Sequence, residues 1–218
     1  MTDAFESMDR MYRLQRYFYD ATRKYYLLGR DRLLDEMDAK PGERVLEAGC
    51  GTARNLIILA KRHPKAHFYG LDASAAMLET AQAKVDAAGV TNITLKTALA
   101  DDFRFDSTFE LAKPFDKIFF SYSISMIPPW RESIQNALHN LAPAGSLFIV
   151  DFYDQAGLPG VFRKALIRWL DLFHVRYPEK LIPYLEGLQR TGEVTSFITP
   201  LYRGYSILIR LEKPAKTT

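Results

Sequence analysis

Short apolar runs alternate with amphipathic segments through the middle of the chain. Between residues 44 and 151, each apolar run is followed by a segment whose hydrophobic positions recur at helical spacing. Such runs predict buried strands, and the segments between them predict helices. We expect strands at 44–49, 67–72, 92–96, 115–120 and 146–151, and helices at 54–61, 74–88 and 130–141. This alternation is typical of βαβ crossovers, so we expect an α/β fold with a parallel sheet and helices on both faces.

The two ends of the chain follow other patterns. Residues 8–38 are rich in aromatic side chains and predict one or two helices. After residue 151, the pattern predicts two helices and two strands. These are expected at 158–174, 178–190, 194–199 and 205–211. The link between the last two strands is short, so we expect them to pair as a hairpin.

Composition narrows the class of protein. Of the 218 residues, 48% are hydrophobic and 25% are charged, which is typical of one soluble globular domain. The single cysteine, Cys50, excludes a disulfide within the chain and a cysteine-cluster metal site, and it favours a reducing compartment. The first residues lack the apolar core of a signal peptide, and no apolar run is long enough to span a membrane. We therefore expect a cytoplasmic protein.

Charge argues against a nucleic-acid partner. The formal net charge of +3 is small for a protein that binds a phosphate backbone. The basic residues instead gather in two segments, 8–30 and 161–176, on either side of a nearly neutral middle.

A glycine-rich turn carries the first chemical signal. The sequence Glu47-Ala-Gly49-Cys-Gly51 lies between a predicted strand and a predicted helix. In open α/β sheets, ligands bind at the carboxyl ends of the strands, and glycines let a ligand approach the backbone there. A nicotinamide dinucleotide would require a third glycine at position 54, where Arg54 stands. The turn therefore disfavours that ligand.

These residues resemble the first motif of the class I S-adenosylmethionine-dependent methyltransferases, with Ala53 in place of the last glycine. The resemblance implies a Rossmann-like, seven-stranded, mostly parallel sheet whose last strand is antiparallel. It implies a methyltransferase domain at 41–213 and a helical lid at 1–40. It also implies that Asp72, after the second strand, accepts the ribose hydroxyls.

The same resemblance implies S-adenosylmethionine as the cofactor and no metal. Leu99 stands where the family usually has an acid, so we take Asp101 as the adenine-side acid and leave Asp102 as the alternative. Arg30, with Tyr19 or Tyr26, is expected to close over the cofactor. The expected cofactor residues are Tyr26, Arg30, Glu47, Gly49, Gly51, Asn55, Asp72, Ala73, Met77, Ala100, Asp101 and Ser121.

The flanking segments resemble bacterial N-methyltransferases of polar-lipid headgroups. Residues 19–30 and 201–205 carry this resemblance, and residues 152–159 and 173–176 favour the betaine-lipid enzymes. The resemblance implies successive methylation of the amine of diacylglyceryl-homoserine. Methylation of phosphatidylethanolamine or of a small molecule stays open, as does a non-catalytic nucleotide-binding module.

An amine accepts a methyl group by direct displacement, which needs a neutral amine held in line with the sulfonium. Aromatic faces attract the resulting quaternary ammonium. We expect Tyr122 and Tyr19 to position the reactants. The expected substrate residues are Arg23, Met126, His174, Tyr202, Arg203 and Tyr205.

The predicted helix at 158–174 is amphipathic. Its apolar stripe comprises Leu158, Phe162, Ala165, Leu166, Trp169 and Phe173, and Arg163, Lys164 and Arg168 lie off this stripe. Such a helix can place its apolar face in the surface of an anionic membrane. We therefore expect peripheral membrane association with a lipid substrate, the alternative being that the stripe packs on the sheet. The sequence does not give the oligomeric state.

Overall fold

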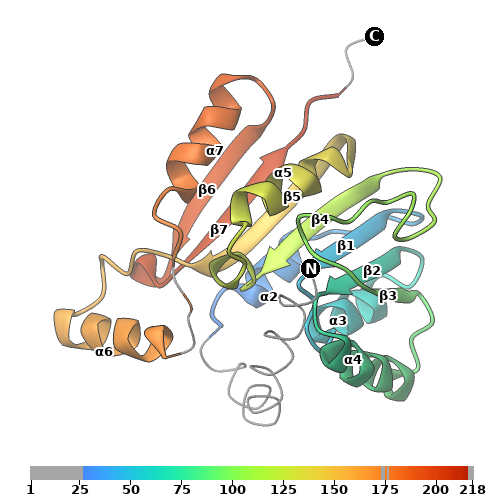
Figure 1. Ribbon diagram of the computed structural model, residues 1–218, viewed down its shortest axis with the longest axis horizontal. Coiled ribbons are helices and arrows are strands. Elements are labelled where there is room, and N and C mark those ends of the chain that lie inside the picture. Colours follow the sequence, from blue (N-terminus) through green and yellow to red (C-terminus); the bar gives the residue numbers. More distant parts are fainter. Residues whose placement is uncertain (1–26, 173–174, 176, 216–218) are drawn as a thin grey trace.

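The computed structural model describes residues 27–172, 175 and 177–215, and its centre is a seven-stranded sheet in the order β3-β2-β1-β4-β5-β7-β6 (Figure 1). The strands are β1 Arg44–Ala48, β2 His67–Asp72, β3 Ile93–Thr97, β4 Phe115–Ser121, β5 Leu141–Phe152, β6 Thr195–Leu201 and β7 Ser206–Glu212. The helices are α2 Arg30–Glu36, α3 Arg54–Arg62, α4 Ala75–Ala88, α5 Trp130–His139, α6 Gly160–Asp171 and α7 Leu181–Arg190, with short 3-10 turns η1 Ile124–Met126 and η2 Tyr202–Gly204.

The strand directions confirm the predicted fold class. Strands β1 to β5 pair in parallel, whereas β7 runs antiparallel to both β5 and β6. The last two strands form the predicted hairpin, joined through η2. The fold is therefore the Rossmann-like, mostly parallel sheet with a reversed last strand.

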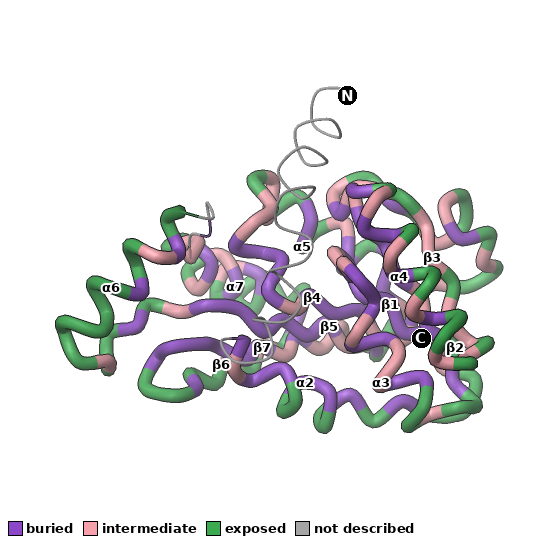
Figure 2. The backbone as a smooth tube through the Cα atoms, turned by 90° about the horizontal axis from the view of Figure 1, so that it is seen from below, coloured by how far each residue is buried: buried purple, intermediate pink, exposed green. Residues whose placement is uncertain are grey.

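Two apolar layers cover the sheet, because neighbouring strand residues point to opposite faces. In β4, Phe119 packs toward α2, α3 and α4, whereas Ile118 and Phe120 pack toward α5 and α7. Figure 2 shows the buried strands between more exposed helices. The residues of both layers are almost completely buried. The parallel pairing of β1 to β5 places the carboxyl ends of these strands at one edge.

The start of the fifth strand differs from the prediction. The strand was expected at 146–151, but β5 begins at Leu141. The pairing with β4 shifts between Leu141 and Ser146, and Ala144 has a φ of 59°. Residues 141–145 are thus absorbed into the strand as a bulge.

Several predicted site residues lie outside the residues that the structure describes. Residues 1–26 fall outside the described residues, so Tyr19, Arg23 and Tyr26 do too, and His174 lies in the undescribed segment 173–174. Of the helices predicted at 8–38, the described part contains α2. The proposed division into 1–40 and 41–213 therefore stays a prediction.

Candidate active site

A cavity of about 460 Å³ opens at the carboxyl ends of β1, β2 and β4. This volume lies within the range of small-molecule and cofactor sites. The described residues expected at the cofactor all line it; these are Arg30, Glu47, Gly49, Gly51, Asn55, Asp72, Ala73, Met77, Ala100, Asp101 and Ser121. The structure thus brings them together, and their contacts with a cofactor stay predictions.

The glycine turn forms one wall of the cavity. The backbone N–H groups of Gly49 and Cys50 both donate to the carbonyl of Leu71, at 2.9 Å each. Gly49 has a φ of 77°, and a Cβ there would lie 2.7 Å from the Cβ of Ser123. The turn therefore needs glycine at this position for both conformation and space.

Asp72 joins this turn to the next helix. Its Oδ2 accepts the N–H of Gly51 at 2.8 Å, and its Oδ1 accepts the N–H of Ser74, the N-cap residue of α4, at 3.0 Å. A carboxylate has about four acceptor positions, so these two bonds do not by themselves exclude ribose hydroxyls. The geometry suits an acid that both shapes the turn and faces a ligand.

Two further buried side chains, Glu47 and Cys50, lie on this side of the cavity. Glu47 Oε1 accepts the side-chain amide N–H of Asn55 at 2.7 Å, which ties β1 to α3 beneath the cavity. Burial raises the pKa of the Cys50 thiol well above its usual value, and the carboxylates of Asp72 and Glu47 raise it further. The thiol therefore stays neutral, which argues against a nucleophilic role.

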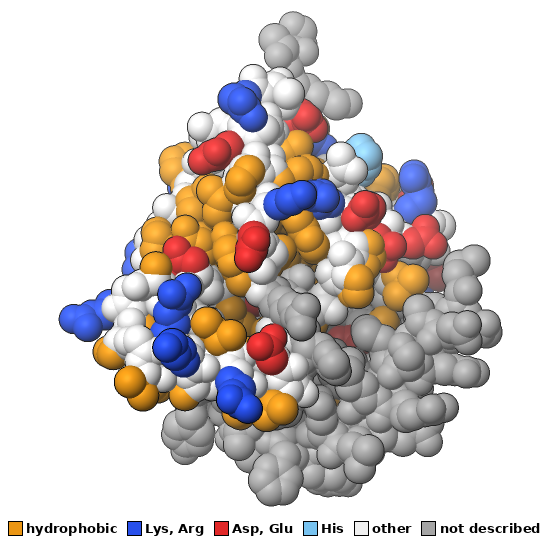
Figure 3. Space-filling model, turned by 60° about the vertical axis from the view of Figure 1, so that its left-hand side comes forward, with side chains coloured by type: hydrophobic (Ala, Val, Ile, Leu, Met, Phe, Trp, Pro, Cys, Tyr) orange, Lys and Arg blue, Asp and Glu red, His pale blue; other side chains and the backbone are white. Residues whose placement is uncertain are grey.

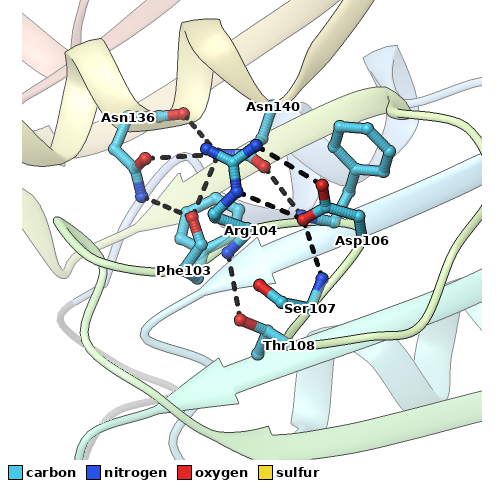
Figure 4. A network of polar contacts seen from close by, with 8 residues as sticks. Phe103, Arg104, Asp106, Ser107, Thr108, Asn136 and Asn140 are labelled. Carbon is cyan, nitrogen blue, oxygen red and sulfur yellow. Dashed lines mark hydrogen bonds and ion pairs between the residues drawn. The ribbon is translucent and has the colours of Figure 1, made fainter.

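Asn136 of α5 and Asn140, the C-cap residue of this helix, hold the loop at 100–105, which forms the opposite wall of the cavity (Figure 4). The Asn136 amide donates to the carbonyls of Ala100, at 3.2 Å, and Phe103, at 3.0 Å. Asn140 accepts the N–H of Phe105 at 2.8 Å. These bonds fix the backbone beside the predicted adenine-side residues, Ala100 and Asp101. The sequence pattern does not reveal this role, because the partners are more than thirty residues apart in the chain.

A third wall follows β4. Asp151 is buried, and its carboxylate accepts the N–H groups of Ser125, at 3.0 Å, and Phe152, at 2.8 Å. It thereby fastens η1, which carries Met126, to the end of β5. Burial is the main cause that raises the pKa of Asp151 to about 6. This residue was also missed, although an acid inside an apolar strand is a recognisable signal.

We expect Asp151→Asn to change how stability depends on pH. A raised pKa means that the folded chain binds this proton more tightly than the unfolded chain, so the free energy of unfolding falls as pH rises from about 4 through about 6. The pKa of about 6, against 3.8 for an ordinary carboxyl, corresponds to up to about 3 kcal/mol. Urea unfolding at a series of pH values should show this fall in the natural protein and not in the variant. Exposed Asp102→Asn is the control, and equal pH profiles for all three proteins would contradict the prediction.

Tyr122 closes the cavity near α2. It is buried, and its hydroxyl donates to the carbonyl of Leu28. Its ring meets the edge of Phe152 at 4.8 Å between centroids, and burial raises its pKa well above the usual value. The hydroxyl thus stays protonated and serves the fold, while the residue still lines the cavity.

The expected substrate residues separate into two places. Met126 lines the cavity, whereas Tyr202 and Tyr205 line a second groove of about 440 Å³. The other residues of this groove are apolar: Leu28, Leu158, Phe162, Leu166 and Trp169. Arg203 lines neither, and its carbonyl accepts the N–H of Gly157 at 3.2 Å.

Several lining residues were not expected from the sequence. They are Leu27, Cys50, Thr52, Arg54, Leu71, Ala98, Leu99, Ser123, Ile127, Pro128 and Pro129. Most of them are small or apolar and lie next to predicted residues. Such side chains carry no chemical signal in the sequence, so only the fold shows that they line the cavity.

The described residues contain no group of three metal-ligating side chains. In the same part of the chain, no helix has the length and hydropathy needed to span a membrane.

Comparison with known proteins agrees with the site. Residues 39–178 match the model of a methyltransferase domain. A demethylmenaquinone methyltransferase of Listeria welshimeri is 28% identical over 138 residues, which cover 63% of this chain and 56% of that protein. A stretch of 54 residues is 54% identical to an uncharacterized methyltransferase of Emericella nidulans and covers 23% of this chain and 19% of that protein. The chain thus spans little more than half the length of the Listeria relative.

Solved structures show the same fold. An S-adenosylmethionine-dependent methyltransferase of Aquifex aeolicus superposes with a TM-score of 0.63 at 17% identity, covering 97% of both chains. The YcgJ protein of Bacillus subtilis gives a TM-score of 0.66 at 17% identity and covers 85% of this chain and 98% of that one. The family match, the sheet order and the glycine turn lead to one conclusion: the chain belongs to the methyltransferase-domain family, and this membership implies S-adenosylmethionine as the cofactor.

Proposed function

We propose that the chain methylates the amine of a polar-lipid headgroup, with diacylglyceryl-homoserine as the substrate that the flanking segments favour. The observation that carries this proposal is the apolar groove behind the cavity wall. Leu27 lines the cavity and Leu28 lines the groove, so adjacent residues separate a site with polar groups from an apolar one. A lipid has the same two parts, a polar headgroup and apolar chains.

When bound, S-adenosylmethionine supplies an electrophilic methyl group on a sulfonium. The residues of this chain hold the reactants and exclude water. Met126, Ile127 and Pro128 give the cavity an apolar side, where a desolvated amine loses its proton more readily. Tyr122 places an aromatic ring at the edge of the cavity, and such rings attract quaternary ammonium groups. Positioning of this kind supplies most of the rate enhancement for a direct displacement.

One second candidate has a specific observation in its favour. The Listeria relative is a demethylmenaquinone methyltransferase, and demethylmenaquinone is also lipid-soluble. Both candidates have an apolar part that the groove could bind, so the acceptor atom distinguishes them.

A transfer assay tests the proposal. The purified chain is incubated with methyl-labelled S-adenosylmethionine and detergent-dispersed diacylglyceryl-homoserine, phosphatidylethanolamine or demethylmenaquinone. We expect label in the homoserine lipid, with mass spectrometry placing the added methyl groups on nitrogen. Asp72→Ala, which alters the cofactor side, should lose the transfer. Label in the quinone alone would overturn the proposal in favour of the second candidate, and label in phosphatidylethanolamine alone would overturn the choice of headgroup.

A further inference from the structure

Helix α6 presents an unusual outer surface. It follows β5 and lies beyond the edge of the sheet where the parallel strands end (Figure 1). Six large hydrophobic side chains are exposed in the described part of the chain, and four of them belong to α6 and its C-cap. These four are Val161, Phe162, Ile167 and Leu172, of which Val161 is 87% exposed and Leu172 is 72% exposed.

The structure corrects which face of α6 is outward. Leu166 and Leu170 are buried in the core, and Trp169 packs against the same cluster. Of the stripe expected to enter a membrane, Leu166 is therefore buried and Leu158 and Trp169 pack against the core, whereas Phe162 and Ala165 are exposed and Phe173 lies outside the described residues. The outward face is instead formed at helical spacing by Val161, Lys164, Ala165, Arg168 and Leu172.

The charge of this face of α6 indicates which kind of partner could bind it. Arg163, Lys164 and Arg168 are exposed, and none of them forms an ion pair with a described residue. Asp171 is the one acidic residue of the helix. In Figure 3, which brings this side of the molecule forward, basic and hydrophobic side chains are interleaved at the lower left.

A second copy of the chain fits poorly here. A two-fold contact would set the same basic residues of both copies against each other, which is unfavourable. A protein partner fits less well than a lipid surface, because the cores of protein interfaces are depleted of lysine. Apolar side chains mixed with long basic ones suit a bilayer, where the apolar groups enter the acyl boundary and the cations reach anionic headgroups.

We propose that α6 docks the protein on an anionic lipid bilayer through Val161, Lys164, Arg168 and Leu172, with Phe162 leading from that surface into the apolar groove. Phe162 is 53% exposed and also lines the groove, so it belongs to both surfaces. Leu28 of the groove is the chain neighbour of Leu27, which lines the cavity. This arrangement deepens the proposed function, on which it rests for the choice of a lipid as partner, because Phe162 joins the docked surface to the apolar groove.

Vesicle sedimentation with the full chain tests the docking. The probes are vesicles of phosphatidylcholine alone and vesicles that also contain phosphatidylglycerol. We expect tighter binding to the anionic vesicles, weakened by high salt because salt screens the attraction. Lys164→Glu/Arg168→Glu should reduce the partition coefficient at least tenfold. Val161→Ser/Leu172→Ser should weaken binding even at high salt, because it removes apolar contact.

The matched control is Lys61→Glu/Arg190→Glu, which makes the same charge change at exposed positions of α3 and α7. It should bind vesicles nearly as well as the natural protein. Equal losses in the two charge-reversal variants, equal binding to both kinds of vesicle, or no binding would overturn the proposal. So would a concentration-dependent dimer that Lys164→Glu/Arg168→Glu abolishes, because a second copy would then cover the face.

Methyl-transfer assays distinguish a failure of membrane docking from a failure of the proposed function. If both hold, Lys164→Glu/Arg168→Glu loses methyl transfer to vesicle-embedded substrate and keeps transfer to detergent-dispersed substrate. Vesicle binding without transfer to an amine in either form would refute the proposed function and leave the docking in place. Transfer in detergent without vesicle binding would refute the docking alone.

Discussion

Asp72→Ala is expected to lower the affinity for S-adenosylmethionine at least about a hundredfold. The carboxylate accepts the N–H groups of Gly51 and Ser74 and lines the cavity where the ribose is expected. Each charge-assisted bond to a ribose hydroxyl contributes about 1.5–3 kcal/mol, and about 1.4 kcal/mol already gives a factor of ten. Loss of the two backbone bonds also loosens the glycine turn, which adds to the effect. Isothermal titration calorimetry of the purified variant measures the change.

Asp102→Ala is the matched control for Asp72→Ala. Asp102 is the alternative adenine-side acid predicted from the sequence, but it is exposed and does not line the cavity, whereas Asp101 does, so the same truncation at Asp102 should leave the affinity unchanged. The circular dichroism spectrum establishes that each variant is folded. An Asp72→Ala protein that folds and binds the cofactor as tightly as the natural chain would contradict the assignment of Asp72 to the ribose.

The sequence was sufficient to predict the sheet because each buried strand is an apolar run flanked by turn residues. Because these strands run parallel, their carboxyl ends meet at one edge, and residues such as Glu47, Asp72 and Ser121 come together there. The shared cavity of the described candidate residues therefore follows from topology alone. Their clustering required no knowledge of side-chain packing.

Other features depend on contacts that the sequence pattern does not contain. A helical stripe on α6 could face the core or a membrane, and only packing shows that Leu166 and Leu170 are buried. The bulge in β5 arises because the pairing with β4 shifts, which periodicity cannot reveal. The roles of Asn136 and Asp151 depend on hydrogen bonds to backbone groups of distant loops. The separation of Tyr202 and Tyr205 from the cavity has the same origin.

Gly49→Ala is expected to destabilise the fold by about 2–5 kcal/mol. An alanine at a φ of 77° is held in the left-handed region, which costs about 1–2 kcal/mol. Its Cβ would also lie 2.7 Å from the Cβ of Ser123, and relieving such an overlap in a packed site costs about 1–3 kcal/mol more. Ser123 cannot easily move away, because its hydroxyl donates to the carbonyl of Ala48 at 3.0 Å. Urea unfolding measures the change in the free energy of unfolding.

Two variants separate the strain at Gly49 from the overlap. Gly42 has a φ of 82° and no atom within 4 Å of an added Cβ, so Gly42→Ala should show the conformational cost alone. Adding Ser123→Gly to Gly49→Ala removes the overlapping Cβ, so the double variant should lose less stability than the two single changes added together. Equal losses in Gly42→Ala and Gly49→Ala, together with additive effects in the double variant, would show that the turn has room for a side chain. The close contact between the glycine turn and the loop after β4 would then not limit which residues the turn accepts.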